Sequence, residues 1–498
     1  MGLLSTDPDQ LNIYGYKFKW GSLHQTPEEL QRHIHTYDTV AAEALDALDE
    51  IVPPAKVGPR KDIQEAVEVE GKKHRDLYSL LKEHAKTDER VGRLWNEVNT
   101  VPEWVDWEQI DRGQKVFWRY GGPSITALTF LSLLGGMGSG RTVETLDRTG
   151  GFGAQVVRRR LLETTQHTLG VHKDLEAIKP GGVEGFESSV RVRLLHASVR
   201  QRVLRLAREK PEYYDLKSYG VPVNDLDCIG TIGTFSATII WMGLPRQGIF
   251  LRPQEIADYL TLWRYVAYLM GTPHDWLATP ETARAMMESL LVSEVKPTKK
   301  SGTLANNIIT GFEGQAPTYA SRGFLNAETY WLNGKDLSRE LNIEKPNLYY
   351  TTLVIGQCLF FMITGYINRM VPSWDERNIK LARKVLYDLL VHNKKRGALG
   401  YRTKFNFKWI PDLQNTTTPL GEPVPGQAER SGALRHAGVE RTALATLVFT
   451  GVMVGVTAWG IWSGFRAVSN LALGIFSGSP SLAGLKAPIW EFSKMVKR

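Results

Sequence analysis

The chain has 498 residues, of which 42% are hydrophobic and 23% are charged, as is usual for a folded globular protein. Its formal net charge of +8 is modest, and the basic residues are scattered without the aromatic interleaving or basic tail of nucleic-acid binders, which argues against a nucleic-acid partner. The two cysteines, Cys228 and Cys358, form no C-x-x-C pair, which excludes a disulfide framework, a zinc ribbon and covalently attached c-type haem. Their apolar neighbours predict two buried thiols.

The N-terminus lacks the basic start and long apolar run of a signal peptide. It matches the pattern M-G-x-x-x-[ST] through Gly2 and Thr6, which makes Gly2 a candidate for myristoylation.

The following chain has a helical character. Apolar residues recur at spacings of three and four over 26–51, 62–98, 124–134, 155–169, 186–208, 227–244, 253–270, 279–292, 346–368 and 375–393. Strand-like alternation is scarce, so we expect an all-α fold. The glycine-rich "GGMGSG" at 135–140 reads as a turn, and 294–326 and 401–441 read as polar and irregular.

The segment 442–465 has 24 residues without a charge, between Arg441 and Arg466. A helix of this length rises ~36 Å and can cross a hydrocarbon core of ~30 Å. Trp459 and Trp462 lie near one end, where interfacial aromatic side chains gather. We therefore expect a single membrane-spanning helix, with a buried hydrophobic helix or an interfacial hairpin as the alternatives. Arginines at both ends leave the orientation open.

The stretch "RVRLLHASVR" places one histidine, His196, on the expected helix 186–208. Arg193 and Arg200 lie three residues before and four residues after it, so they flank the imidazole along one side over roughly 10.5 Å. The remaining neighbours on this face are Val192, Val199 and Val203. Such a row suits a flat, apolar, anionic molecule such as haem, whose iron binds imidazole and whose propionates pair with guanidinium groups. A partly solvated histidine on a charged helix face is the alternative.

This stretch, with "GVPVNDLDCIGTIGTFS" and "GIFLRPQEIADYLTLWRYVAYLMGTP" after it, resembles the catalytic domain shared by the latex-clearing rubber oxygenases and the endoplasmic-reticulum oxygenase of the mycophenolic-acid pathway. The resemblance covers roughly 110–400, and its best motif is R-x-x-H-x-x-x-R. It implies an all-helical fold around a globin-like core, with haem b held through its iron by His196 and with Arg193 and Arg200 around it. It also implies that dioxygen is the co-substrate for oxidative cleavage of carbon–carbon double bonds in isoprenoid-type chains.

The resemblance extends to residues upstream of the histidine. The family pairs an arginine and a threonine near the distal face of the haem, and "RLLET" supplies Arg160 and Thr164 at a helical spacing of four. A glutamate proposed as the catalytic base in rubber oxygenases lies sixteen residues before that arginine, at the position of Glu144. The alternative for Glu144 is an ordinary ion pair with Arg148 at i+4.

One position departs from the family. Some rubber oxygenases carry a lysine before the threonine, able to occupy the sixth position of the iron, and this sequence has Glu163 there. Arg158 or Arg159 could pair with that glutamate. Glu163 and His167, at i and i+4, could also bind a non-haem metal, although paired E-x-x-H motifs of di-iron sites are absent from the sequence. His274 and His392 read as polar residues at helix ends.

Five segments are expected: an N-terminal helical extension (1–110), a haem-binding oxygenase domain (111–400), a linker (401–441), a transmembrane helix (442–465) and a C-terminal tail (466–498). The sequence thus predicts a membrane-anchored, single-pass, haem b-dependent oxygenase for a lipophilic alkene, with membrane lipid as its other partner and an endoplasmic-reticulum location compatible with the resemblance. A non-catalytic haem-binding membrane protein and a non-haem metalloenzyme or hydrolase are the alternatives.

Overall fold

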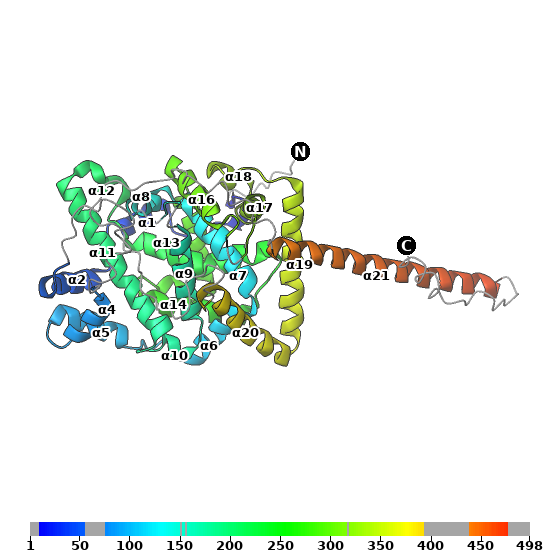
Figure 1. Ribbon diagram of the computed structural model, residues 1–498, viewed down its shortest axis with the longest axis horizontal. Helices are drawn as coiled ribbons and strands as arrows, with labels where there is room; N and C mark the ends of the chain where they lie inside the picture. The colour runs from blue at the N-terminus through cyan, green and yellow to red at the C-terminus, as the bar shows by residue number, and fades with distance from the viewer. Residues whose placement is uncertain are drawn as a thin grey trace. The chain divides into compact units, whose positions relative to one another are not determined.

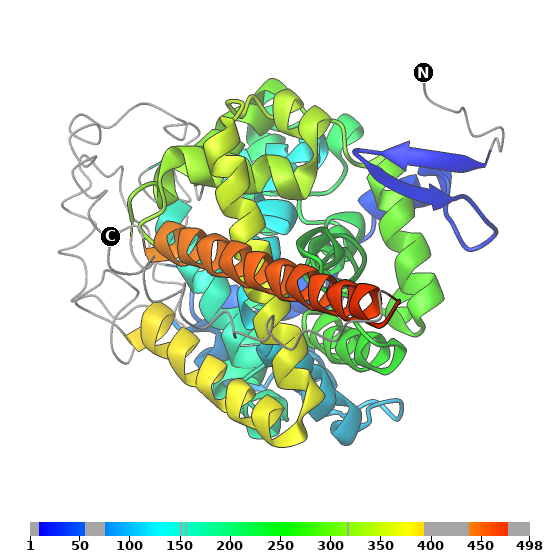
Figure 2. The same cartoon turned by 90° about the vertical axis from the view of Figure 1, so that its right-hand side faces the viewer.

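A computed structural model describes residues 9–54, 75–149, 152–154, 157–315, 318–392 and 438–476. These residues are mostly helical, which confirms the expected all-α fold. In addition to helices, the N-terminal segment 1–110 contains an antiparallel hairpin of β1 (Gln10–Ile13) and β2 (Tyr16–Lys19), visible as arrows in Figure 2. The chain divides into two units, the first ending at Ala443 and the second beginning at Leu444.

The helices of eight or more residues have the following bounds: α2 (Thr39–Ile51), α4 (Leu77–His84), α5 (Glu89–Asn99), α6 (Trp107–Arg119), α8 (Gly140–Thr149), α9 (Val157–Val171), α11 (Ser188–Glu209), α13 (Asp225–Phe235), α14 (Pro253–Leu269), α15 (Pro280–Ser293), α16 (Lys299–Phe312), α17 (Arg322–Asn333), α19 (Leu348–Met370), α20 (Pro372–Tyr387) and α21 (Gly438–Phe476). The shorter helical segments are α1 (Pro27–Gln31), η1 (Arg32–Ile34), α7 (Gly121–Ala127), η3 (Leu128–Leu134), η4 (Gly135–Gly138), α10 (Leu175–Ile178), η5 (Val183–Glu187), η6 (Pro211–Tyr213), α12 (Leu216–Tyr219), η7 (Ile239–Gly243), η8 (Pro245–Gln247), η9 (Asp275–Leu277), α18 (Lys335–Glu340) and η10 (Asp388–His392).

The expectation of irregular chain over 294–326 is wrong, because α16 and the start of α17 lie there. Thr298 caps α16 by accepting a hydrogen bond from the backbone N–H of Ser301. Leu304 and Ile308, four residues apart, are fully buried, so a helical apolar face exists among the polar residues that obscured it. The segment "GGMGSG", expected as a turn, forms the 3-10 turn η4 and leads directly into α8.

Two predictions at the chain's ends fall partly or wholly on residues that the structure does not describe. Gly2 lies outside the described residues, and so do residues 401–437 of the expected linker. The last four residues of that expected linker, 438–441, already belong to α21. The predicted membrane segment 442–465 is therefore the middle of a longer helix.

Helices α6 and α14 pack at the centre of the helical core. Their backbones approach each other at Gly113, where a Cβ atom would lie 2.3 Å from the carbonyl oxygen of Asp258. Around this crossing Trp118, Trp263 and Tyr259 are buried almost completely. Burial of such large rings removes much apolar surface from water, so this crossing contributes strongly to the stability of the fold.

Helices α9 and α11 carry most of the predicted site residues, and the long α11 is prominent in Figure 1. The chain returns from α9 to α11 through η5, which packs against the end of α9. A Cβ atom at Gly170 would lie 2.2 Å from the carbonyl oxygen of Glu184, so this packing needs a residue without a side chain. The close turn holds α9 and α11 in contact with each other.

Candidate functional site

His196 lies in the middle of α11 and faces the interior. Its side chain keeps a small accessible surface although protein atoms surround the imidazole. Burial lowers the pKa of the imidazole to about 4, and the nearby cations Arg200 and Arg160 act in the same direction. Within the part of the chain that the structure describes, its ring nitrogens make no hydrogen bond. At neutral pH His196 is therefore uncharged and has a lone pair available for a metal ion.

Arg200 lies one turn after His196 on α11 and is buried. Its Nη2 donates a hydrogen bond of 2.8 Å to the carbonyl oxygen of Val223, and its guanidinium carbon lies 4.8 Å from the centre of the Tyr37 ring. Its Nε and Nη1 are also buried and have no hydrogen-bond partner among the described residues. Because unpaired buried donors are costly, these two N–H groups are well suited to an anionic ligand such as a carboxylate.

Arg193, the other predicted arginine, is held by two carboxylates. Its Nε lies 2.6 Å from Oδ2 of Asp38, and its Nη2 lies 2.8 Å from Oε1 of Glu97. A Cβ atom at Gly271 would lie 2.5 Å from Nε, so the backbone there packs directly against the guanidinium group. These contacts tie α11 to the N-terminus of α2 and to α5, and they balance the charge of Arg193. Its role in cofactor binding stays a prediction.

Arg160 and Thr164 occupy successive turns of α9, as predicted. The Thr164 hydroxyl donates to the carbonyl oxygen of Arg160 at 3.1 Å, and Thr164 lines a cavity. Burial lowers the pKa of Arg160, and the positive charge of Arg160 in turn lowers the pKa of His196. The two helices thus bring Arg160 near His196 in space.

Glu163, the residue that departs from the family, is buried and paired with Arg159. The Arg159 Nε lies 3.2 Å from Oε1 of Glu163, which confirms one of the two expected pairings. The other oxygen, Oε2, is buried without a hydrogen-bond partner among the described residues. Burial raises the pKa of this carboxyl group, with Arg159 and Arg160 opposing the rise.

Glu144, the predicted catalytic base, is buried in an ion-pair cluster. Its Oε2 lies 2.6 Å from Nη1 of Arg148 and 2.7 Å from Nζ of Lys300. The i+4 partner Arg148 is the alternative that the sequence offered, whereas Lys300 comes from α16. Both cations also contact Asp147, at 2.8 and 3.0 Å. Both cations therefore hold the same oxygen of the Glu144 carboxylate, and the base assignment stays a prediction.

A cavity of about 320 Å³, partly open to the surface, lies beside α9, α13 and the wide π-type turn η3. Such turns are rare and are frequent at functional sites. The wall is mainly apolar, and most of the polar residues in it are threonines from different segments: Thr129, Thr142, Thr164, Thr165, Thr168, Thr231, Thr234 and Thr238. On α13, residues 227, 230, 231 and 234 follow helical spacing and share the face turned toward the cavity.

At one end of the cavity Arg141, Asp227 and Glu294 form a charged group. Sequence reasoning missed this group and the threonine-rich wall. The stripe "D-x-x-G-T-x-x-T" from Asp227 to Thr234 was a usable signal, because it puts small and polar residues on one side of an otherwise apolar helix.

The other histidines have local roles. His167 Nδ1 is hydrogen-bonded to Oγ of Ser188 at 2.8 Å, and the ring of His172 stacks on Phe117 with 4.0 Å between ring centres. His274 precedes η9, as expected for a helix-end residue, and the side chain of His392 lies outside the description. Among the described residues, no group of three or more His, Cys, Asp or Glu side chains is arranged to hold a metal ion. The non-haem alternative therefore lacks a ligand set in this part of the chain.

Three comparisons with known proteins bear on the site. Residues 118–354 match the family model of the "ER-bound oxygenase mpaB/B'/Rubber oxygenase, catalytic domain". Among solved structures, Latex Clearing Protein LCP in the closed state is similar, with a TM-score of 0.53 at 16% sequence identity over 75% of this chain and 94% of that chain. This likeness concerns the fold. Aurantioclavine synthase cnsA of Penicillium expansum is 38% identical over 58 residues, which are 10% of this chain and 12% of that protein.

The chain thus matches only a small part of the curated relative. The resemblance to the rubber oxygenases and mpaB is confirmed over residues 118–354, where the family match points to an oxygenase of this type. The likeness to the solved structure confirms the helical fold.

Proposed function

We propose that this chain is a membrane-associated, haem b-dependent oxygenase that cleaves a carbon–carbon double bond in a lipophilic, isoprenoid-type substrate. The observation that carries the proposal is the position of the buried imidazole of His196, which has no hydrogen-bond partner among the described residues, one helical turn from the unpartnered buried donors of Arg200. An iron ligand and an anion-binding group one helical turn apart meet the two chemical requirements of haem.

The residues present fit haem b. His196 would hold the iron, Arg200 would bind a propionate, and Arg160 and Thr164 are the candidates for the polar groups on the distal side. Arg193 would have a positioning role, because its ion pairs with Asp38 and Glu97 fix the helix that carries His196. When bound, haem supplies the iron centre at which dioxygen, the proposed co-substrate, reacts.

The chain's own contribution is a dry, shaped cavity and a small set of polar groups. Apolar side chains of α9, α13 and η3 exclude water from the alkene and hold it in position. Glu163, whose pKa is raised by burial, can retain its proton nearer to neutral pH than an exposed glutamate. The resemblance assigns proton abstraction to Glu144, and in this chain that carboxylate would first have to separate from Arg148 and Lys300.

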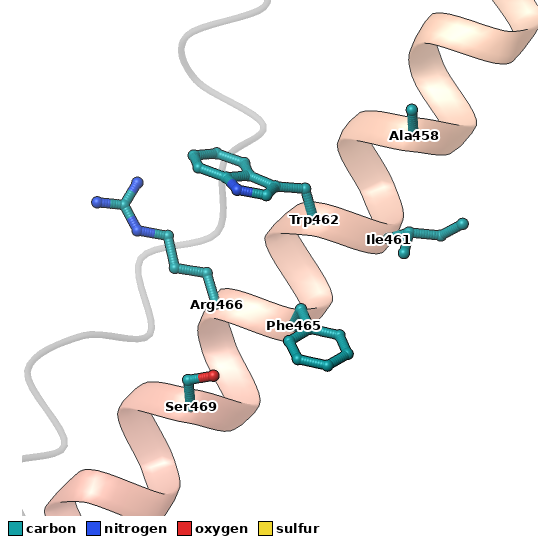
Figure 3. A pocket seen from close by; sticks show the side chains of 6 residues that line it. All are labelled: Ala458, Ile461, Trp462, Phe465, Arg466 and Ser469. Carbon is teal, nitrogen blue, oxygen red and sulfur yellow. The ribbon is translucent and has the colours of Figure 1, made fainter.

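Candidate apolar helices are compatible with membrane association. An 18-residue window within residues 438–469 of α21 has a mean hydropathy of 1.8, and none of this window is buried. Figure 3 shows Trp462 and Arg466 on α21, and the guanidinium carbon lies 5.1 Å from the centre of the indole ring. An aromatic ring with a cation at the end of an apolar helix is typical of the membrane interface. We propose that α21 crosses the bilayer once, with the endoplasmic reticulum as the membrane.

Two further helices are apolar enough to be considered. An 18-residue window of α19 has a mean hydropathy of 1.5 and is one-third buried, with Ile355, Ile363 and Ile367 on the exposed side of the helix. A window of the segment 225–243, which includes α13, has a mean hydropathy of 1.2 and is 61% buried, so it belongs to the protein core. α21 is therefore the preferred membrane anchor.

The test is an absorption spectrum of the full-length protein purified after haem supplementation. We expect a Soret band in the wild type, its loss in His196→Ala, and its retention in the control His274→Ala, which changes a histidine beside Trp104 and Tyr268 instead. An unchanged Soret band in His196→Ala would show that another residue holds the haem. No band in the wild type would remove the haem proposal altogether.

A haem-binding membrane protein without catalysis is the second candidate, and the observation in its favour is that Glu144 is held by Arg148 and Lys300. Oxygen consumption with an added isoprenoid alkene separates the two. Uptake of oxygen that depends on both the alkene and His196 supports the oxygenase, whereas a haem-loaded protein without such uptake supports the binding protein.

A further inference from the structure

The charged end of the cavity carries an excess of negative charge. Arg141 places Nη1 at 2.9 Å from Oδ1 of Asp227 and Nη2 at 2.8 Å from Oε2 of Glu294, so one guanidinium group faces two carboxylates. All three residues line the cavity. Haem propionates would be repelled here, whereas Arg200 offers unpartnered donors elsewhere. This end of the cavity is therefore free to serve the substrate.

Asp227 has one oxygen committed to the protein and one available. Oδ1 receives the ion pair from Arg141 and a hydrogen bond of 2.8 Å from the Thr142 hydroxyl. Oδ2 receives no hydrogen bond from the described residues, although the side chain is only 7% exposed. Burial raises the pKa of this carboxyl group, whereas the ion pair with Arg141 and the hydrogen bond from Thr142 oppose the rise. In the ionised form Oδ2 can only accept hydrogen bonds, so a ligand that binds it there would be a donor.

The threonines in the wall do not supply that donor. The hydroxyls of Thr164, Thr168 and Thr231 donate to carbonyl oxygens four residues earlier in their own helices, at 3.1, 3.0 and 2.8 Å. Thr129 and Thr165 do the same at 2.8 Å. These side chains therefore present methyl groups and acceptor lone pairs to the cavity, because their protons are already used. The wall as a whole suits an apolar ligand with a hydrogen-bond donor at one end.

We propose that the substrate carries a hydroxyl or protonated amine on an otherwise apolar, alkene-bearing skeleton, and that Asp227 binds this donor at the Arg141–Asp227–Glu294 end of the cavity. The inference rests on the proposed function, because it takes this cavity to be the substrate site of the same oxygenase. A pure hydrocarbon chain would bury Oδ2 of Asp227 without any partner, which disfavours it relative to a donor-bearing chain of equal length.

The test measures dissociation constants of three probes for the full-length protein in detergent, by calorimetry. The probes are farnesol, farnesylamine and farnesyl methyl ether, which share one chain and differ in the donor. We expect the alcohol and the amine to bind roughly tenfold or more tightly than the ether, as a hydrogen bond to a charged group implies. The ratio of the dissociation constants of farnesol and farnesylamine shows whether a neutral or a cationic donor is preferred. Equal binding of all three probes by the wild type would overturn the proposal.

Asp227→Asn is the diagnostic variant. Its amide oxygen can still accept from Arg141 and Thr142, which leaves the NH₂ group as a donor toward the cavity. We expect the preference for the alcohol over the ether to fall to within about twofold. Comparing one probe between proteins also cancels its partition into detergent. A preference that persists in Asp227→Asn would contradict the assignment.

The matched control is Asp258→Asn, because Asp258 is also a buried aspartate paired with an arginine. Its Oδ2 lies 3.0 Å from Nε of Arg112, and it does not line the cavity. This variant should keep the wild-type preference for the alcohol over the ether. Loss of that preference in Asp258→Asn would show that breaking any buried ion pair has the same effect.

Gly230→Leu locates the probes, because a Cβ atom there meets nothing within 4 Å and projects from the cavity wall. We expect all three probes to bind at least tenfold more weakly in this variant. Unchanged binding would place the probes outside the cavity and overturn the proposal even if Asp227→Asn does not fold. A wild type that lacks the Soret band yet keeps the probe preference would refute the oxygenase proposal alone.

Discussion

Gly230 gives a test in which stability and function should change in opposite directions. It lies inside α13, and a Cβ atom built there has no heavy atom within 4 Å. Replacing glycine by alanine within a helix is worth about 1 kcal/mol, and no clash opposes it here. We therefore expect Gly230→Ala to raise the free energy of unfolding by about 1 kcal/mol. For a domain of this length that corresponds to a rise in Tm of about 1–2 °C.

A larger side chain at Gly230 should also slow catalysis, because it fills part of the cavity. Gly230→Leu adds four carbon atoms to the wall of a cavity of about 320 Å³. We expect it to remain at least as stable as the wild type while kcat/KM for alkene-dependent oxygen consumption falls by tenfold or more. Thermal unfolding followed by circular dichroism and an oxygen electrode give the two measurements.

Gly113→Ala is the contrasting control, because there a Cβ atom would lie 2.3 Å from the backbone oxygen of Asp258. This substitution should destabilise the crossing of α6 and α14. A Gly230→Ala protein that is less stable than the wild type, or a Gly230→Leu protein with unchanged kinetics, would refute the reasoning about the cavity.

Three further predictions concern the rest of the chain. Burial lowers the pKa of His172 to about 3, so between pH 6.5 and pH 3 only the unfolded chain binds a proton at this residue. The free energy of unfolding therefore falls with falling pH, by roughly 5 kcal/mol in total. His172→Phe should flatten acid unfolding of the haem-free protein followed from pH 7 to 4, and an unchanged pH dependence would contradict this. Glu144→Gln should lower Tm, because Arg148 and Lys300 lose a partner, while kcat changes less than tenfold. A hundredfold loss of kcat at unchanged Tm would restore its role as a base. Val454→Arg places a charge in the middle of α21 at a cost of roughly 3 kcal/mol for insertion, so carbonate extraction should release this variant but not Val454→Leu. Equal retention of both would show that α21 is not the main anchor.

Contacts within one helix were accessible from the sequence. The expected helix 186–208 is α11, at Ser188–Glu209, and the expected pairs Glu144–Arg148 and Glu163–Arg159 both occur. They could be predicted because residues four apart on a helix are neighbours whatever the rest of the chain does. Family resemblance then gave these local patterns a chemical meaning, and it is confirmed over residues 118–354.

Contacts between distant segments came only with the tertiary structure. Arg193 meets Asp38 across 155 residues, and Lys300 meets Glu144 across 156 residues. Both contacts change the chemistry of a predicted site residue, because each neutralises a charge that the sequence presents as available.

By itself the sequence determined most of the helices, the isolated histidine and the uncharged apolar segment 442–465, since each of these depends on periodicity or composition over a short stretch. The tertiary structure decided which charges remain unpaired and where the chain leaves space. Arg200 keeps free donors, and Asp227 keeps one free oxygen at the end of a cavity. These properties depend on which helices pack together. Packing brings side chains that are far apart in the sequence into contact, and they then compete for the same hydrogen-bond and ion-pair partners.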